Sequence, residues 1–168
     1  MRAAFALLTI LPVGAIRTAP GRSVLFAFPL VGLAIGAIWM GVGAGVGLWL
    51  GPLVGAAAVL TADAIVTGGL HLDGVADVGD VIGSRRRGAE ALAVARDPRV
   101  GALGVVALVS VMLVRFSLIT VVLTSATGAA DPHLAWFLLA VPTVGRMAMV
   151  AALAWSPPAE GSSTTPLI

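Results

Sequence analysis

The sequence predicts an all-α protein built as a bundle of about four transmembrane helices, and three observations predict it. Hydrophobic residues make up 59% of the 168-residue chain and charged residues only 11%, whereas a soluble domain carries about 25% charged residues. The mean hydropathy of +1.06 is too high for a surface that faces only water. Residues 23–62 contain no charge, which leaves room for two membrane spans of roughly 20 residues each.

Turn signals divide the apolar sequence into four spans. Gly51 and Pro52 separate the first two, because proline stops a helix, and the stretch SATGAADP at 125–132 separates the last two. A short apolar segment at 1–16, ended near Pro12, is expected to be an interfacial helix, and the chain is interpreted as starting without a signal peptide. Residues 1–155 are expected to form one membrane-embedded domain, followed by a disordered tail at 156–168 that is rich in proline and serine. We predict the spans at residues 24–49, 53–70, 101–124 and 134–155.

Basic residues predict the orientation of the bundle. The chain has ten arginines and lysines against eight acidic residues, and most of the arginines fall in segments that four spans place on one side. By the positive-inside rule, the polar loop at 71–100 is cytoplasmic and the protein lies in the inner (plasma) membrane. The arginines are scattered rather than arranged in a stripe, so we expect the lipid bilayer and not nucleic acid as a partner, with a homo-oligomer left open. The absence of cysteine excludes disulfides and thiolate metal sites. The arginines on this side are Arg17, Arg22, Arg85, Arg86, Arg87, Arg96 and Arg99.

The stretch HLDGVADVGD at 71–80 gathers three aspartates in an otherwise apolar chain. Asp73, Asp77 and Asp80 are spaced i, i+4 and i+7, so on a helix they share one face. Carboxylates so placed repel one another unless a cation joins them, and Mg²⁺ takes one or two carboxylates together with substrate phosphates. We therefore predict a Mg²⁺ site here; the alternative is a solvated loop whose aspartates cap helix ends. His71 is a candidate general base or phosphate donor, and its alternative role is to anchor a helix end.

Arginines near this motif suit phosphate binding. In RDPRVG at 96–101, Asp97 is expected to cap the third span, and Arg96 and Arg99 are expected to bind phosphate through their forked donors. Arg115 and Arg146 lie inside predicted spans, where a charge faces the bundle interior and is either functional or paired.

Asp63 is the one acidic residue inside a predicted span. Counted from the cytoplasmic ends of their spans, Asp63 and Arg146 lie at similar depths. We therefore predict that these two residues pair.

Several of these motifs together resemble one family of integral membrane enzymes. The motifs are TGGLHLDGVADVGD at 67–80, RDPRVGALG at 96–104, a basic residue in the third span, GRMAM at 145–149 and FALLTILPV at 5–13. They resemble the cobalamin synthase (adenosylcobinamide-GDP ribazoletransferase) family over nearly all of residues 5–155. Val81 stands where the family usually has glycine, and the family's later T-G-D-x-L-G-A motif is absent, so the chain is expected to be a C-terminally shortened copy.

The resemblance implies a Mg²⁺-dependent transferase. It would join α-ribazole, or α-ribazole 5′-phosphate, to adenosylcobinamide-GDP, releasing GMP and forming adenosylcobalamin or its phosphate. Site residues follow by position: His71, Asp73 and Asp77 as catalytic, Asp73, Asp77 and Asp80 as metal ligands, and Arg96, Arg99 and Arg146 for the substrate.

Two alternatives to this function stay open. One is a different membrane transferase of diphosphate substrates; the D-G-x-x-A-R spacing of CDP-alcohol phosphotransferases is not met, because Asp77 stands in place of arginine. The other is a small cation transporter that uses Asp63, Arg115 and Arg146 along its pathway.

Overall fold

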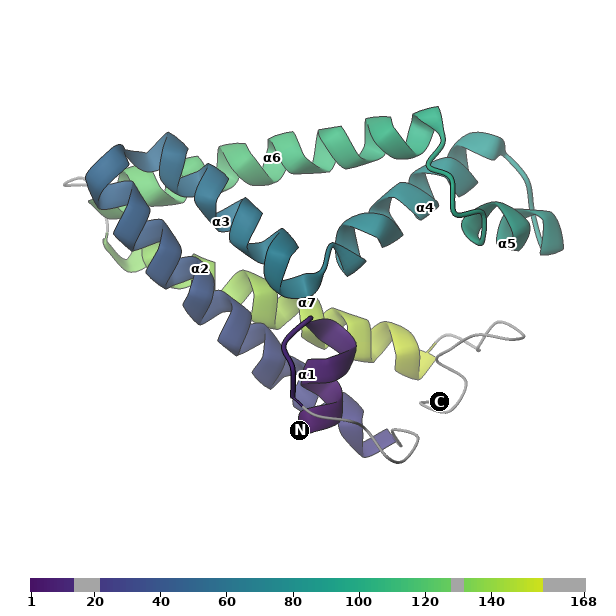
Figure 1. The fold of residues 1–168 in the computed structure, drawn as a ribbon, viewed down its shortest axis with the longest axis horizontal. Coiled ribbons are helices and arrows are strands. Elements are labelled where there is room, and N and C mark those ends of the chain that lie inside the picture. The colour runs from purple at the N-terminus through teal and green to yellow at the C-terminus, as the bar shows by residue number, and fades with distance from the viewer. Residues whose placement is uncertain (14–21, 128–131, 156–168) are drawn as a thin grey trace.

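The structure, a computed structural model, describes residues 1–13, 22–127 and 132–155, and every regular element in these residues is a helix. Figure 1 shows α2 and α7 below α6, with α3 and α4 forming a V between them. Two 3₁₀ helices, Arg22–Ala27 and Pro132–Ala135, lead into α2 and α7. The α-helices are α1 (Arg2–Leu8), α2 (Phe28–Leu50), α3 (Pro52–Thr67), α4 (Leu70–Ser84), α5 (Ala89–Ala95), α6 (Ala102–Thr127) and α7 (Trp136–Trp155).

The predicted membrane bundle is confirmed, with three spans that match the sequence prediction and one that does not. Within the described residues, three helical segments are long and apolar enough to cross a membrane: Val24–Leu50, Ala102–Ala126 and His133–Trp155. The second predicted span, 53–70, corresponds to α3. Helix α4 follows it at an angle of 92°, so the two helices form either a broken span or a re-entrant loop. Residues 71–84 are therefore helical, although the sequence placed them in a loop.

The sharp bend has a local cause. Gly68 and Gly69 both adopt the left-handed conformation, at φ 62° and 73°, which residues with a Cβ rarely adopt. A Cβ on Gly68 would also come within 2.6 Å of the Ile10 side chain. Ile10 in turn donates its amide to the carbonyl of Val66, at 2.9 Å, so the segment after α1 holds the bend in place.

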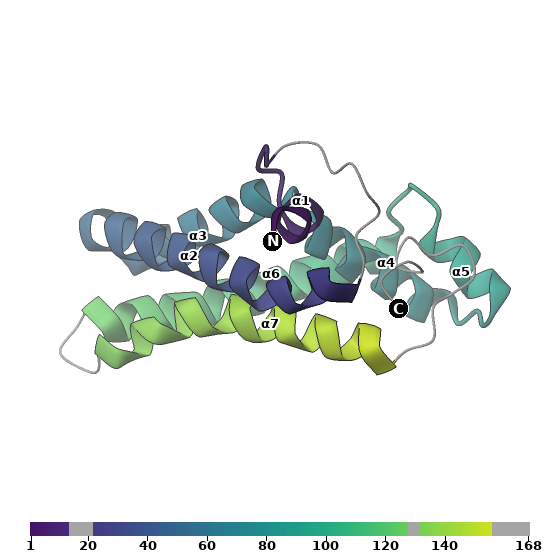
Figure 2. The same cartoon turned by 90° about the horizontal axis from the view of Figure 1, so that it is seen from below.

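Helix α2 is the centre of the bundle, and Figure 2 shows it between α3 and α7. Glycines permit the contact with α7, because a Cβ on Gly32 would lie 2.6 Å from the Pro142 carbonyl and one on Gly36 equally close to that of Leu139. Small residues at such crossings let two backbones approach closely in a membrane. On the other side, Gly55 of α3 packs on the backbone of Gly47.

Helix α1 is shorter than expected and packs on the bundle. It ends at Leu8, before Pro12, and Ala4 and Leu8 are buried against the core of α2. Residues 156–168, where a disordered tail was predicted, lie outside the described residues.

Candidate functional site

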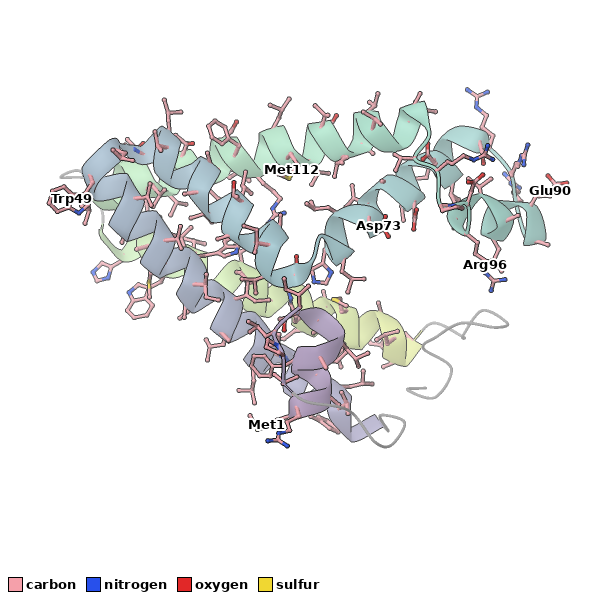
Figure 3. All side chains as sticks on the ribbon, viewed as in Figure 1. Met1, Trp49, Asp73, Glu90, Arg96 and Met112 are labelled. Carbon is pink, nitrogen blue, oxygen red and sulfur yellow. The ribbon has the colours of Figure 1, made fainter. Side chains whose placement is uncertain are left out.

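Helix α4 carries the three aspartates of the acidic motif. Because α4 is continuous from Leu70 to Ser84, Asp73, Asp77 and Asp80 occupy one face of it, as the spacing predicted. Asp73 is exposed, and Asp77 and Asp80 are half-buried. Figure 3 shows Asp73 on α4 between the α3–α4 bend and the α5 end. Asp73 also lines a cavity of about 560 Å³ that extends from Thr9 and Ile10 to α6. Of the three aspartates, Asp73 is the one that borders this cavity among the described residues.

Asp80 differs from the other two aspartates because its carboxylate caps helix α6. The amide of Gly101 donates to Oδ2 and the amide of Gly104 to Oδ1, both at 2.7 Å. A carboxylate at a helix N-terminus accepts hydrogen bonds from the free amides, and its negative charge interacts favourably with the positive end of the helix dipole. A Cβ on either glycine would overlap this carboxylate. The spacing of glycines in RDPRVGALG therefore has a structural reason, which is the close approach of Asp80.

The prediction that Asp97 caps the third span is wrong. Helix α6 begins at Ala102, and Asp97 instead accepts three hydrogen bonds from Arg99: from the backbone amide at 3.0 Å, Nε at 3.0 Å and Nη2 at 2.8 Å. This pairing lowers the pKa of the Asp97 carboxyl to about 2. The sequence suggested that Arg99 is unpaired, but the structure pairs it with Asp97. Its side chain is nevertheless 86% exposed. Arg96 is also exposed, at the end of α5.

The donor set fits a magnesium ion only in part. Within the described residues, no group of three His, Cys, Asp or Glu side chains is arranged to hold a metal ion. Asp80 already accepts two backbone amides, whereas Asp73 and Asp77 accept no hydrogen bond in the described part of the chain. Two carboxylates one helical turn apart meet the need of Mg²⁺, which fills its other positions with water and substrate oxygens. The residues therefore fit a metal that arrives with a phosphate substrate.

A second polar cluster lies inside the bundle, around Asp63 of α3. Arg115 Nη2 donates to Asp63 Oδ2 at 2.6 Å, and Trp39 Nε1 donates to Oδ1 at 3.2 Å. The Arg115 guanidinium also lies 5.2 Å from the centre of the Trp39 ring, which adds a cation–π contact. Trp39 was not among the residues predicted to take part, although an indole N–H within a span requires an acceptor.

The predicted pairing of Asp63 with Arg146 is wrong, since Arg115 occupies that position. The similar depth of Asp63 and Arg146 along their spans did not determine the partner of Asp63. Helix α3 packs on α6, which carries Arg115, whereas α7, which carries Arg146, packs on α2. Arg146 lies with His71 on a cavity of about 300 Å³. The structure thus places His71 and Asp73, only two positions apart on α4, on two different cavities. That separation matches the roughly 200° between positions i and i+2 on a helix.

The protein-family comparison decides where this chain belongs. A family model described as "Cobalamin-5-phosphate synthase" matches residues 1–167. The chain is a member of that family. No solved structure matches it significantly.

Curated relatives agree with the family assignment. The chain is 34% identical to an adenosylcobinamide-GDP ribazoletransferase of Herpetosiphon aurantiacus, over 90% of this chain and 59% of the relative. It is 40% identical to one of Pseudomonas syringae pv. syringae, over 77% of this chain and 50% of the relative, and 38% identical to one of Acinetobacter baumannii, over 83% and 55%. The chain therefore spans about half the length of the relatives it matches.

Proposed function

We propose that this chain takes part in the transfer reaction for which its relatives are named, with adenosylcobinamide-GDP as one substrate. A ribose hydroxyl of α-ribazole, or of α-ribazole 5′-phosphate, attacks the phosphorus next to the cobinamide. A new phosphodiester bond forms, the bond to GMP breaks, and GMP and a proton are released. The observation that carries the proposal is the carboxylate face of α4, whose Asp73 lines a cavity of about 560 Å³, because a diphosphate needs a cation and space at one place.

Asp73 and Asp77 are the residues that would hold Mg²⁺. When bound, the ion would neutralise charge on the diphosphate as the leaving phosphate departs. Asp80 acts one turn further on: by capping α6 it fixes the segment that carries Arg96 and Arg99 against the end of α4. Arg99 lines a hollow of about 390 Å³ together with Asp80 and its ion-pair partner Asp97, which supports a role for this exposed arginine in binding a substrate phosphate.

We propose that His71 does not act as the general base that its place in the motif suggested. It lies on the opposite side of α4 from Asp73, and it shares a cavity with Arg146 and not with Asp73 or Asp77. We also propose that the α4–α5 region faces the cytoplasm of the inner membrane. The arginines Arg85, Arg86 and Arg87 that follow α4 support this orientation.

The test is GMP release from adenosylcobinamide-GDP and α-ribazole by the purified full chain in detergent. We expect release with Mg²⁺ and none with EDTA. Asp73→Asn and Asp77→Asn should each lower the rate at least about tenfold, because each removes a ligand charge at similar shape. Glu90→Gln is the matched control, since Glu90 is an exposed acid on α5 away from the site. A folded chain that releases no GMP, or aspartate variants that behave like the control, would contradict the proposal.

A further inference from the structure

The cavity between α2, α3, α4, α6 and α7 contains polar groups that the proposed reaction does not use. It has a volume of about 300 Å³, and its walls include the side chains of Trp39, Pro142 and Met149. Arg146 is only 7% exposed, and its Nε and Nη2 atoms are buried with no hydrogen-bond partner among the described residues. Nη1 makes one long contact, 3.5 Å, with the carbonyl of Pro142. His71 Nε2 is likewise buried without a partner.

The charges around this cavity do not balance. Among the described residues Asp63 is the one acid in its lining, and both oxygens of its carboxylate are already bonded, to Arg115 and Trp39. One aspartate therefore faces two arginines, and an arginine does not lose its proton in a protein. A buried charge without a partner is costly in a low-dielectric interior, and so are buried N–H donors without acceptors. The described residues accordingly carry one positive charge and several donors in excess around this one cavity.

We propose that Arg146 and His71 form a binding site for a phosphate group inside the helix bundle. A guanidinium offers two parallel N–H donors that match two oxygens of a phosphate, and Nε and Nη2 of Arg146 are such a pair. His71 Nε2 supplies a third contact from α4 as the N–H donor of the neutral imidazole, in the tautomer with its hydrogen on Nε2. The bound anion brings the charge of the cluster to neutrality or below, and it satisfies the three orphaned atoms at once.

The site lies behind the carboxylate face, because His71 precedes Asp73 by two residues on the same helix. In the proposed transferase it would hold a second phosphate, separate from the diphosphate on the metal, and this assignment of its role rests on the proposed function. Two sources carry the same chemistry: a phosphate on a soluble substrate, or the phosphate of a lipid headgroup that reaches in from the bilayer.

The experiment measures thermal unfolding of the delipidated full chain in a neutral detergent with EDTA present. Inorganic phosphate is titrated in one arm, and phosphatidic acid in mixed micelles in the other. A hundredfold excess over the dissociation constant should raise the melting temperature by roughly 5 to 10 °C. A shift with inorganic phosphate indicates a soluble phosphate ligand, and a shift with phosphatidic acid alone indicates a lipid headgroup. No shift in either arm overturns the proposal.

Variants separate binding from folding. Arg146→Gln should lose at least about tenfold in phosphate affinity. Without ligand it should melt no lower than the parent, because it removes an uncompensated buried charge. His71→Asn should weaken phosphate affinity a few-fold, and Arg86→Gln, which changes an exposed arginine beyond α4, should change nothing. An Arg146→Gln protein that keeps the phosphate shift, or that melts lower than the parent without ligand, would overturn the proposal.

The two proposals fail independently. Asp73→Asn and Asp77→Asn should keep the phosphate shift in EDTA, since neither residue lines this cavity. A parent chain that releases GMP but shows no Arg146-dependent shift contradicts the phosphate site alone. A parent chain that shows the shift but releases no GMP contradicts the transferase proposal alone.

Discussion

Replacing Asp80 by asparagine should destabilise the protein, whereas the same change at Asp73 should not. The Asp80 carboxylate accepts the amides of Gly101 and Gly104 at 2.7 Å each, and a hydrogen bond to a charged group contributes about 1.5 to 3 kcal/mol. Asparagine offers one oxygen and turns an NH₂ group toward the other amide. One bond is lost and the second is weakened, so the free energy of unfolding should fall by about 2 kcal/mol. For a chain of 168 residues this corresponds to a melting temperature lower by roughly 4 to 8 °C.

Thermal unfolding in detergent, followed by circular dichroism, measures this difference. Asp73→Asn is the control, because Asp73 is exposed and has no hydrogen-bond partner in the described residues; its effect should stay within about 0.5 kcal/mol. Gly104→Ala should resemble Asp80→Asn, since its Cβ would overlap the carboxylate and approach the Ala76 carbonyl to 2.8 Å. Equal melting temperatures for the Asp80 and Asp73 variants would refute the capping role and return Asp80 to the metal ligands alone.

Three further predictions concern the bundle. Arg115→Ala should cost about 3 to 5 kcal/mol by leaving Asp63 buried without its cation, and the double variant with Asp63→Ala should cost less than the sum; strict additivity in a double-mutant cycle would argue against the ion pair. Gly36→Val should separate α2 from α7, because its Cβ meets the α7 backbone at 2.6 Å, and a melting temperature like that of the parent would contradict this packing. Cysteines at Ser84 and Ser125, near opposite ends of the α4–α6 pair, should react with an impermeant thiol reagent from opposite sides of the membrane, and labelling from one side would refute the topology.

Composition alone was enough to predict the class of fold. A chain with 11% charged residues and uncharged stretches of span length has few options besides membrane helices, because each backbone amide in a bilayer must be bonded within its own segment. Three spans were predicted within a few residues, since hydropathy measures the quantity that the bilayer selects. The acidic motif and its helical spacing were equally visible, because periodicity is a local property.

The tertiary structure decided the bend and the partners of the charged residues. A Gly-Gly pair inside an apolar run is compatible with a continuous helix. The left-handed φ angles of Gly68 and Gly69, which produce a bend of 92°, are visible only in the structure. Depth along a span does not determine which helix lies beside which, so Asp63 pairs with Arg115 rather than with Arg146. Local sequence pointed to Asp97 as the cap of α6, whereas Asp80, 21 residues before Gly101, fills that place. Each of these contacts depends on how helices pack against one another, and a pattern of hydropathy and spacing along one chain does not carry that information.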